Sequence, residues 1–312
     1  MTTSPFSQRR KFIISLGKAL HKFGTPAYRL EAHLLNVTAI LGMGGSFIVT
    51  PTSLTFALWQ LGEHEQQQLY VVRVKPGDLD LGSLARTDEL VDELASGERS
   101  LVEAIDRLED IKNKPEPYSH PVSFMAFGIS GGAFAMLMAT SWNDVIWSFV
   151  MSLVVYLFVY WASISKGVSK MLEPLVSLVS AFCVAGIMHY DPHINKSLVV
   201  LSSIIAFIPG LALTLGLREL AARDLMSGTA RIMDAIMLLF KLYFGAVLGF
   251  AIGKMVWGDV EFVQPEQVQA WTAWIAVLLL GSSLVVMFKI RLKDSPWGIL
   301  SGFIAFGMSS LA

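Results

Sequence analysis

The residues best suited to bind a charged solute are Arg231, Asp234 and Lys241, at the start of the apolar run 230–256. Ionisable groups inside a bilayer are costly and usually functional. Asp234 and Lys241 are seven residues apart, so they share one helix face. The Lys241 ammonium could bind a carboxylate, and Asp234 could bind an amino group or a proton. Alternatively, Lys241 extends to the membrane surface, as long cationic side chains do.

A second candidate is a break in the preceding apolar run, at Pro209 and Gly210. Proline removes a backbone donor, so we expect a broken helix in which the carbonyl of Ile205 is free. Such breaks in a membrane face protein or a watery cavity, and in transporters they often supply binding groups. Ser203 is a further candidate substrate contact. The alternative is a packing kink that Ser202 or Ser203 repairs.

Three glycines continue the Lys241 stripe at four-residue steps, namely Gly245, Gly249 and Gly253. Small residues at this spacing let another helix approach closely. The stripe therefore predicts helix packing on this face, and it favours a Lys241 that faces other helices rather than lipid.

Composition limits the class of protein. The chain has 312 residues, of which 54% are hydrophobic and 16% charged, whereas soluble domains carry about 25% charged residues. The formal net charge of -1 gives no basic field for nucleic acid. The single cysteine excludes an intrachain disulfide and a cysteine-rich metal domain. These values indicate an integral membrane protein, for which we expect no metal and no cofactor.

The chain divides into a charged part and an apolar part. Residues 1–120 hold 13 Lys and Arg and 15 Asp and Glu, and the segment that follows residue 113 contains three prolines that forbid a continuous helix. We predict a cytoplasmic α+β domain over 1–120, a five-helix membrane bundle over 121–257, and two further spans over 258–312, apparently the start of a second half-bundle. The domain is predicted to hold helices at 26–41, 87–96 and 100–113, and strands at 46–50, 54–60 and 69–74.

The fold class that results is a polytopic α-helical membrane protein with an N-terminal cytoplasmic α+β domain. Apolar runs long enough to cross about 30 Å of hydrocarbon recur seven times. They lie near 122–141, 145–164, 171–189, 197–217, 230–256, 271–289 and 296–312. Alternate loops are rich in Lys and Arg, which places those loops, and the N-terminal domain, in the cytoplasm. The predicted location is the cell (inner) membrane.

Short motifs resemble the threonine/serine exporter family. They are Gly24-Thr25-Pro26-Ala27-Tyr28-Arg29-Leu30-Glu31, then Ile208-Pro209-Gly210, then Arg218-Glu219-Leu220 and Ser227-Gly228-Thr229-Ala230-Arg231. The resemblance implies a cytoplasmic domain with ten membrane helices in two halves of five. It implies proton-driven export of threonine and serine, or of small dicarboxylates in two-chain members. Because the second half is short here, we expect a homo-oligomer or a partner that supplies the missing helices.

The hypothesis from the sequence is therefore a secondary transporter that exports threonine, serine or a related small carboxylate. Its partners would be that solute, protons and the lipid bilayer, with no nucleic acid. The alternative is a membrane-anchored regulatory or scaffold protein whose cytoplasmic domain binds a ligand or partner. An enzyme is not expected, because no nucleophile and base are recognisable in the sequence.

Overall fold

The computed structural model describes residues 5–62, 67–75, 77 and 79–311. It divides into two compact units, and each is described by itself. Unit 1 comprises residues 1–116 and 210–234, and unit 2 comprises 117–209 and 235–312. The first division lies after residue 116, and residues 210–234 pack with the N-terminal part.

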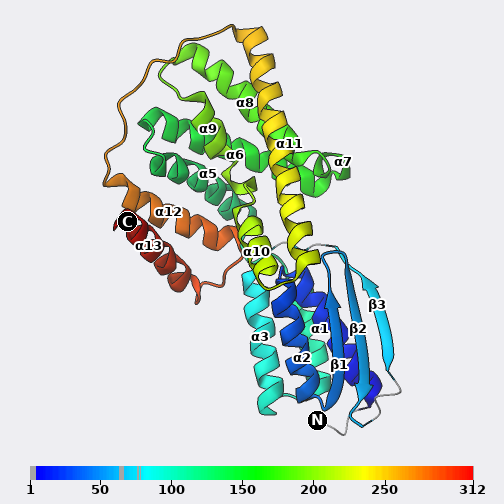
Figure 1. The fold of residues 1–312 in the computed structure, drawn as a ribbon. Helices are drawn as coiled ribbons and strands as arrows, with labels where there is room; N and C mark the ends of the chain where they lie inside the picture. Colours follow the sequence, from blue (N-terminus) through cyan, green and yellow to red (C-terminus); the bar gives the residue numbers. More distant parts are fainter. Residues whose placement is uncertain (1–4, 63–66, 76, 78, 312) are drawn as a thin grey trace. The chain divides into compact units, whose positions relative to one another are not determined.

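Unit 1 contains a three-stranded antiparallel sheet and helices (Figure 1). Its elements are α1 (Phe6–Lys22), α2 (Ala27–Ile40), β1 (Met43–Val49), β2 (Ser53–Gln60), β3 (Gln68–Arg73), α3 (Leu81–Ser96), α4 (Leu101–Asn113), α10 (Gly210–Ala221) and the start of α11 (Leu225–Trp257). The strand order is β1-β2-β3, and Phe47 pairs with Phe56 in register. Helix α4 starts with a capping box, because Ser100 and Glu103 exchange hydrogen bonds there.

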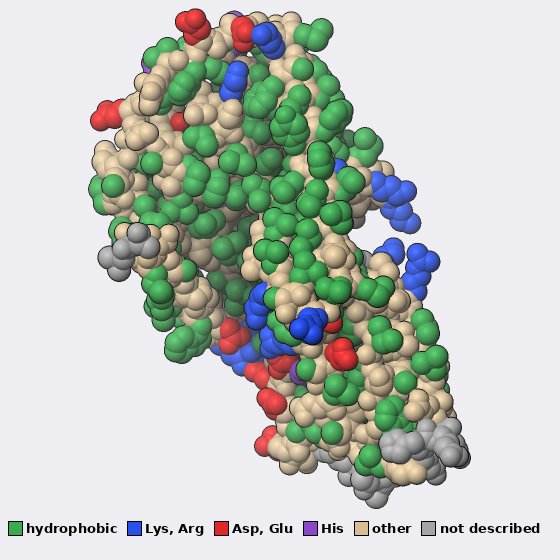
Figure 2. Space-filling model, in the orientation of Figure 1, with side chains coloured by type: hydrophobic (Ala, Val, Ile, Leu, Met, Phe, Trp, Pro, Cys, Tyr) green, Lys and Arg blue, Asp and Glu red, His purple; other side chains and the backbone are tan. Residues whose placement is uncertain are grey.

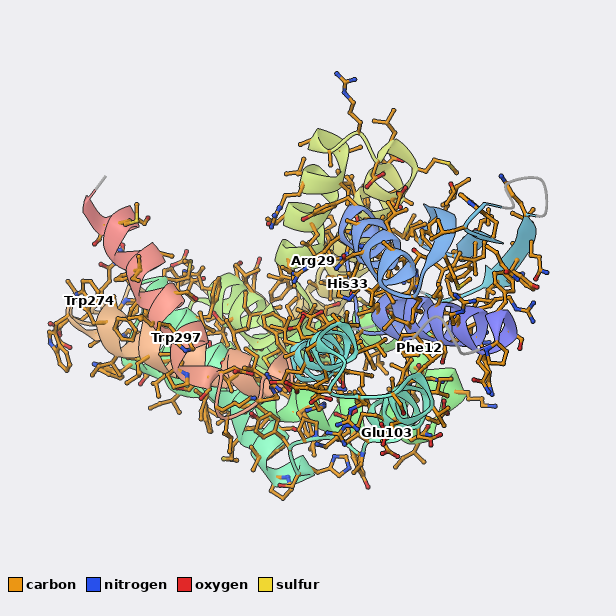
Figure 3. All side chains as sticks on the ribbon, turned by 90° about the horizontal axis from the view of Figure 1, so that it is seen from below. Phe12, Arg29, His33, Glu103, Trp274 and Trp297 are labelled. Atoms are coloured by element: carbon orange, nitrogen blue, oxygen red, sulfur yellow. The ribbon has the colours of Figure 1, made fainter. Side chains whose placement is uncertain are left out.

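The core of unit 1 lies between the sheet and α1, α2 and α4. Phe12, Leu16, Leu34 and Phe56 are fully buried in it, and Figure 3 shows Phe12 on the inner side of α1. Burying side chains of this size contributes about 1.5–3 kcal/mol each. Helix α1 was not predicted, because its basic residues mask an apolar stripe of Phe12, Ile13, Leu16 and Leu20.

The glycine-rich segment 42–45 has two different roles. Gly42 forms the turn after α2, with a φ of 64°. Gly44 and Gly45 belong to β1, and a side chain at Gly44 would collide with the indole of Trp59 on β2. The glycine therefore makes room for an aromatic ring rather than for a turn.

Unit 2 is a bundle of helices. It holds α5 (His120–Leu137), α6 (Trp142–Ile164), the short α7 (Lys166–Ser169), α8 (Leu172–Tyr190), α9 (Lys196–Ser203), the 3₁₀ turn η1 (Ile205–Phe207), the rest of α11, α12 (Thr272–Met287) and α13 (Ser295–Leu311). Helix α5 packs against α6 and α12. Figure 2 shows hydrophobic side chains over much of the visible face, and α11 exposes Phe240, Phe244 and Met255. Exposed apolar side chains of this kind suit a helix that contacts lipid.

Each predicted apolar run is helical in the structure, but fewer of them are long enough to cross a membrane than the seven expected. In the described residues, α5, α6, α8 and α11 qualify by length and composition, and α9 with α10 makes a fifth if the bent pair is one span. Helices α12 and α13 have 16 and 17 residues. At 1.5 Å per residue they reach about 24–26 Å, which is less than about 30 Å of hydrocarbon.

The two ends of the bundle differ in charge. We define the basic end by the loops that carry Lys166, Lys170 and Lys289, and the acidic end by those that carry Asp191 and Asp259. Tyr118 Oη donates to the carbonyl of Ile290 (2.5 Å), so the start of α5 and the end of α12 share the basic end. At the acidic end, the backbone N–H of Val268 donates to the carbonyl of Thr140 (2.9 Å). The long connection from α11 to α12 is thereby tied down at that end.

Candidate functional site

The centre of unit 1 is an ion pair between Glu219 on α10 and Arg231 on α11. Arg231 Nε and Nη2 donate to the two carboxylate oxygens of Glu219 at 3.0 and 3.1 Å. The Glu219 side chain is fully buried, and it also accepts the backbone N–H of Ala27 at 3.0 Å. A bidentate salt bridge of this kind fixes the relative orientation of the two side chains and also neutralises the buried charge. It therefore joins three segments that lie far apart in the sequence.

Local backbone geometry brings these three segments together. Gly24 has a φ of 85°, which turns the chain after α1 so that Pro26 can start α2 and direct the Ala27 N–H outward from its first turn. Between α10 and α11, Arg223 has a φ of 67°, and the N–H of Asp224 donates to the carbonyl of Glu219. This left-handed turn reverses the chain and brings Arg231 back beside Glu219.

Further polar groups surround the Glu219–Arg231 pair. Burial lowers the pKa of His21; the Thr50 backbone raises it and the Arg231 guanidinium lowers it. Burial raises the pKa of Asp224, and the Glu219 carboxylate adds to that shift. The start of α11 is fixed to the sheet because Ser227 Oγ donates to the carbonyl of Val49 (3.1 Å). The sequence indicated Arg231 as a ligand for substrate, but it did not reveal Glu219 as its partner.

The helix break starts in unit 2, earlier than the predicted Pro209. Helix α9 ends at Ser203, and η1 follows with a 3₁₀ pattern. The predicted free carbonyl at Ile205 is wrong, because the N–H of Ile208 donates to it (3.1 Å). The tighter i→i+3 pattern instead leaves the Ser203 carbonyl without its helical partner. The Ser152 hydroxyl of α6 donates to that carbonyl at 3.3 Å.

Buried hydroxyl groups line the bundle next to this break. Ser148 and Ser152 on α6 and Ser202 and Ser203 on α9 are each at most 1% exposed. Among the described residues, the hydroxyls of Ser148 and Ser202 have no hydrogen-bond partner. A buried hydroxyl without a partner costs about 1–3 kcal/mol. The bundle interior therefore retains unused hydrogen-bonding capacity near the break.

Of the two residues predicted at the break itself, Pro209 is half-buried and Gly210 is exposed.

Lys241 lies level with the first turn of α8, near the basic end of the bundle. Its Nζ is 3.8 Å from the carboxylate of Glu173, and the Lys241 side chain is 44% exposed. From Lys241 to the end of α11 at Trp257 the helix rises about 24 Å. Asp234 is exposed and, within the described chain, forms no ion pair. Of these two candidates, Lys241 has a carboxylate partner on another helix, and Asp234 has none among the described residues.

The glycine stripe of α11 packs along α8. A side chain at Gly245 would collide with Ser177 and Pro174, and one at Gly249 with the carbonyl of Leu178. One turn later, a side chain at Gly253 would meet Ala185. The contacted residues of α8 increase in number as the glycines of α11 do, so the two helices run parallel. The close approach holds α11 against α8 at the level of Lys241 and beyond.

Comparison with known proteins identifies the family. The family model described as "Putative threonine/serine exporter" matches residues 11–253. The chain belongs to this family. The match begins in α1 and ends in α11, so it includes the Glu219–Arg231 pair, the break after α9 and the glycine stripe.

Relatives of this exporter-family chain include fungal membrane proteins. It is 28% identical over 254 residues to "Pheromone-regulated membrane protein 10" of Pichia sorbitophila, covering 80% of this chain and 25% of the relative. It is 25% identical over 300 residues to an uncharacterised protein of Schizosaccharomyces pombe, covering 94% and 39%. The chain thus spans about a quarter to two fifths of the length of these relatives. No solved structure was found to match.

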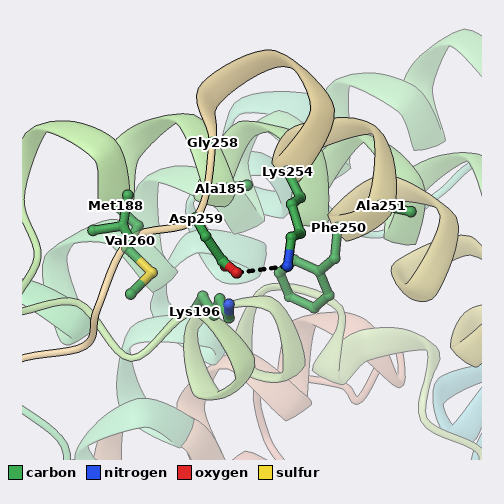
Figure 4. A pocket seen from close by; sticks show the side chains of 9 residues that line it. All are labelled: Ala185, Met188, Lys196, Phe250, Ala251, Lys254, Gly258, Asp259 and Val260. Carbon is green, nitrogen blue, oxygen red and sulfur yellow. Dashed lines mark hydrogen bonds and ion pairs between the residues drawn. The ribbon is translucent and has the colours of Figure 1, made fainter.

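The acidic end of the bundle holds a hollow lined by two lysines, Lys196 and Lys254 (Figure 4). The Lys254 ammonium is 2.5 Å from the carboxylate of Asp259, and Lys196 lies over the ring of Phe250. Lys254 lowers the pKa of Asp259 by a hydrogen bond and by its charge. The pair is largely exposed, so it contributes little to stability.

Proposed function

We propose that this exporter-family chain is a secondary transporter that carries threonine, serine or a related small carboxylate out of the cytoplasm. Family membership supports a membrane transporter. The observation that carries the proposal is the broken span beside two buried hydroxyls without partners, those of Ser148 and Ser202. Such hydroxyls complement the hydroxyl, ammonium and carboxylate groups of a small amino acid. The Ser203 and Ile205 carbonyls at the break each accept one hydrogen bond, and a carbonyl can accept a second one from a substrate.

The proposed orientation places the basic end and unit 1 in the cytoplasm, by the preference of Lys and Arg for cytoplasmic loops. Lys241, paired with Glu173 at that end, would be the first cation met by a substrate carboxylate. Arg231, Asp234, Pro209, Gly210 and Ser203 remain candidate contacts along the same route. The driving force would be proton exchange, with an acidic group such as the exposed Asp234 coupling it to substrate release.

The experiment is efflux of preloaded labelled threonine, serine and succinate from cells that express the chain, with and without a protonophore. The variants are Ser148→Ala and Ser202→Ala. The matched control is Ser282→Ala, whose exposed hydroxyl donates to its own helix at Leu278 (2.8 Å). We expect protonophore-sensitive efflux that falls at least tenfold in the two buried variants and less than twofold in the control.

The chain should be tested alone and with a partner chain that supplies further helices. Unchanged efflux in Ser148→Ala and Ser202→Ala would reject the break as the binding region. No efflux of any solute in either format, with the protein verified in the membrane, would reject transport. That result would favour the alternative of a regulatory or scaffold protein.

A further inference from the structure

Unit 1 contains a polar hollow whose lining does not include Glu219 or Arg231. It has a volume of about 170 Å³ and lies between the start of α2 and helix α3. At about 30 Å³ per water, it has room for roughly six waters. A ligand of this size has few heavy atoms. Leu20, Leu81 and Leu84 supply apolar walls.

Two polar atoms in the wall of this hollow lack partners. The Thr25 hydroxyl belongs to a residue that is 9% exposed, and it has no hydrogen-bond partner in the described part of the chain. The same holds for Nε2 of His33, which is also buried. Burial lowers the pKa of His33, and the Asp88 carboxylate partly offsets this. A neutral imidazole can accept a hydrogen bond at one nitrogen, so the pair can take a hydroxyl group.

Charged groups of both signs stand at the rim. Asp88 on α3 is 3.9 Å from the Arg29 guanidinium and 3.8 Å from Nδ1 of His33. Both distances exceed a hydrogen bond, so neither contact satisfies these groups. Arg29 and His33 are one helical turn apart, and Figure 3 shows them close together on α2. The Arg29 and Asp88 side chains are 66% and 43% exposed, so both remain open to a ligand.

We propose that this hollow binds a small zwitterionic amino acid that carries a hydroxyl group. Its carboxylate would pair with Arg29, its ammonium with Asp88, and its hydroxyl with Thr25 and His33. The arrangement accounts for each polar group in the hollow, including the two without partners. A purely anionic ligand would leave Asp88 facing like charge, and an apolar ligand would leave Thr25 and His33 unsatisfied.

This site would be a ligand-sensing site in unit 1, in addition to any transport route through unit 2. It does not depend on the proposed function, since all its residues lie between Leu20 and Asp88. The hollow can therefore bind its ligand even if the chain exports nothing, and export can occur even if the hollow binds nothing.

The test uses the full chain in lipid nanodiscs with L-serine as the probe, measured by calorimetry. Three analogues each remove one group: L-alanine lacks the hydroxyl, ethanolamine lacks the carboxylate, and lactate lacks the ammonium. We expect saturable binding of serine. The dissociation constant of each analogue should be at least tenfold higher than that of serine. Hydrogen exchange should slow on binding at residues 25–33 and 81–88.

Variants separate this hollow from other sites. Thr25→Val and Asp88→Asn should each weaken serine binding at least tenfold, while the exposed Asp106→Asn on α4 should change it less than twofold. Ser282→Ala, which changes an exposed position of the bundle, should leave this binding unchanged. No saturable binding by the native chain, or equal binding by Thr25→Val and Asp88→Asn, would overturn the proposal. Loss of the signal in Ser202→Ala with native affinity in Asp88→Asn would place the ligand in unit 2 and also overturn it.

Discussion

Arg231 holds the fully buried carboxylate of Glu219 through two hydrogen bonds of 3.0 and 3.1 Å. The same carboxylate accepts the Ala27 N–H, so one ion pair connects the start of α2 with the hairpin of α10 and α11. Three of the motifs that resemble the exporter family meet at this point. The arrangement explains why residues 210–234 belong to the same compact unit as the N-terminal helices and sheet.

Removing the arginine should destabilise unit 1 strongly. We expect Arg231→Met to lower the free energy of unfolding by about 3–5 kcal/mol, because it leaves a buried carboxylate without its counter-charge. Resistance to limited proteolysis in detergent would measure this loss. The double variant Glu219→Gln with Arg231→Met should recover part of it, and the exposed Arg218→Met serves as the control. Equal stability of Arg231→Met and the native chain would contradict the structural role of the pair.

The glycine stripe of α11 should not tolerate a methyl group. Gly249→Ala places Cβ 2.8 Å from the Cβ of Ala181 and against the carbonyl of Leu178. Overpacking of this kind typically costs about 1–3 kcal/mol, which outweighs the gain of about 1 kcal/mol in helix propensity. The thermal midpoint of the detergent-solubilised protein should fall. Gly302→Ala meets nothing within 4 Å and should not lower it. A midpoint unchanged in both would show that α11 does not pack tightly on α8.

Unit 1 should lose stability in mild acid through His21. Its pKa lies below the ordinary histidine value of 6.5, mainly because of burial, so the folded state favours the neutral ring. The stabilising contribution is complete above pH 6.5 and is lost as the pH falls through the lowered pKa. The slope is at most about 1.4 kcal/mol per pH unit.

The check is the thermal midpoint between pH 7.5 and 5.5, compared with His21→Gln. The variant should be less sensitive to acid than the native chain. Glu31→Gln is a control of opposite sign, because burial, with the Asp224 carboxylate adding to it, raises the pKa of Glu31. The contribution of Glu31 is present at low pH and is lost as the pH rises. An identical acid sensitivity in His21→Gln would exclude His21 as the titrating group.

Lys241 gives a separate test of transport. Its ion pair with Glu173 is 3.8 Å long and partly exposed, so Lys241→Met should cost less than about 1 kcal/mol of stability. If the ammonium receives the substrate carboxylate, efflux should fall at least tenfold while expression and oligomer size stay unchanged. Glu173→Gln removes the same ion pair and keeps the cation, so it should retain most of the efflux. Full efflux by Lys241→Met would remove this residue from the proposed route.

The features that could be predicted from the sequence are those that depend on residues close together along the chain. Apolar runs predicted the helices of unit 2, and the helix predicted at 100–113 agrees with α4. Basic side chains concealed α1, because its apolar stripe shows only when the helical period is followed through Phe12 and Leu16. The position of the helix break also depended on its surroundings. Ser152 of α6 satisfies the carbonyl of Ser203, which allows α9 to end before Pro209.

The sequence by itself determined the membrane class, the family and the helical segments, because hydrophobic run length and short motifs are properties of the chain alone. Only the tertiary structure decided which charges pair. Glu219 meets Arg231, and Lys241 meets Glu173, through contacts between residues that are 12 and 68 positions apart. Spacing along one helix could not predict either pair, because each partner lies on a different helix. Ion pairs form over a few ångströms of space, and helix packing sets that distance.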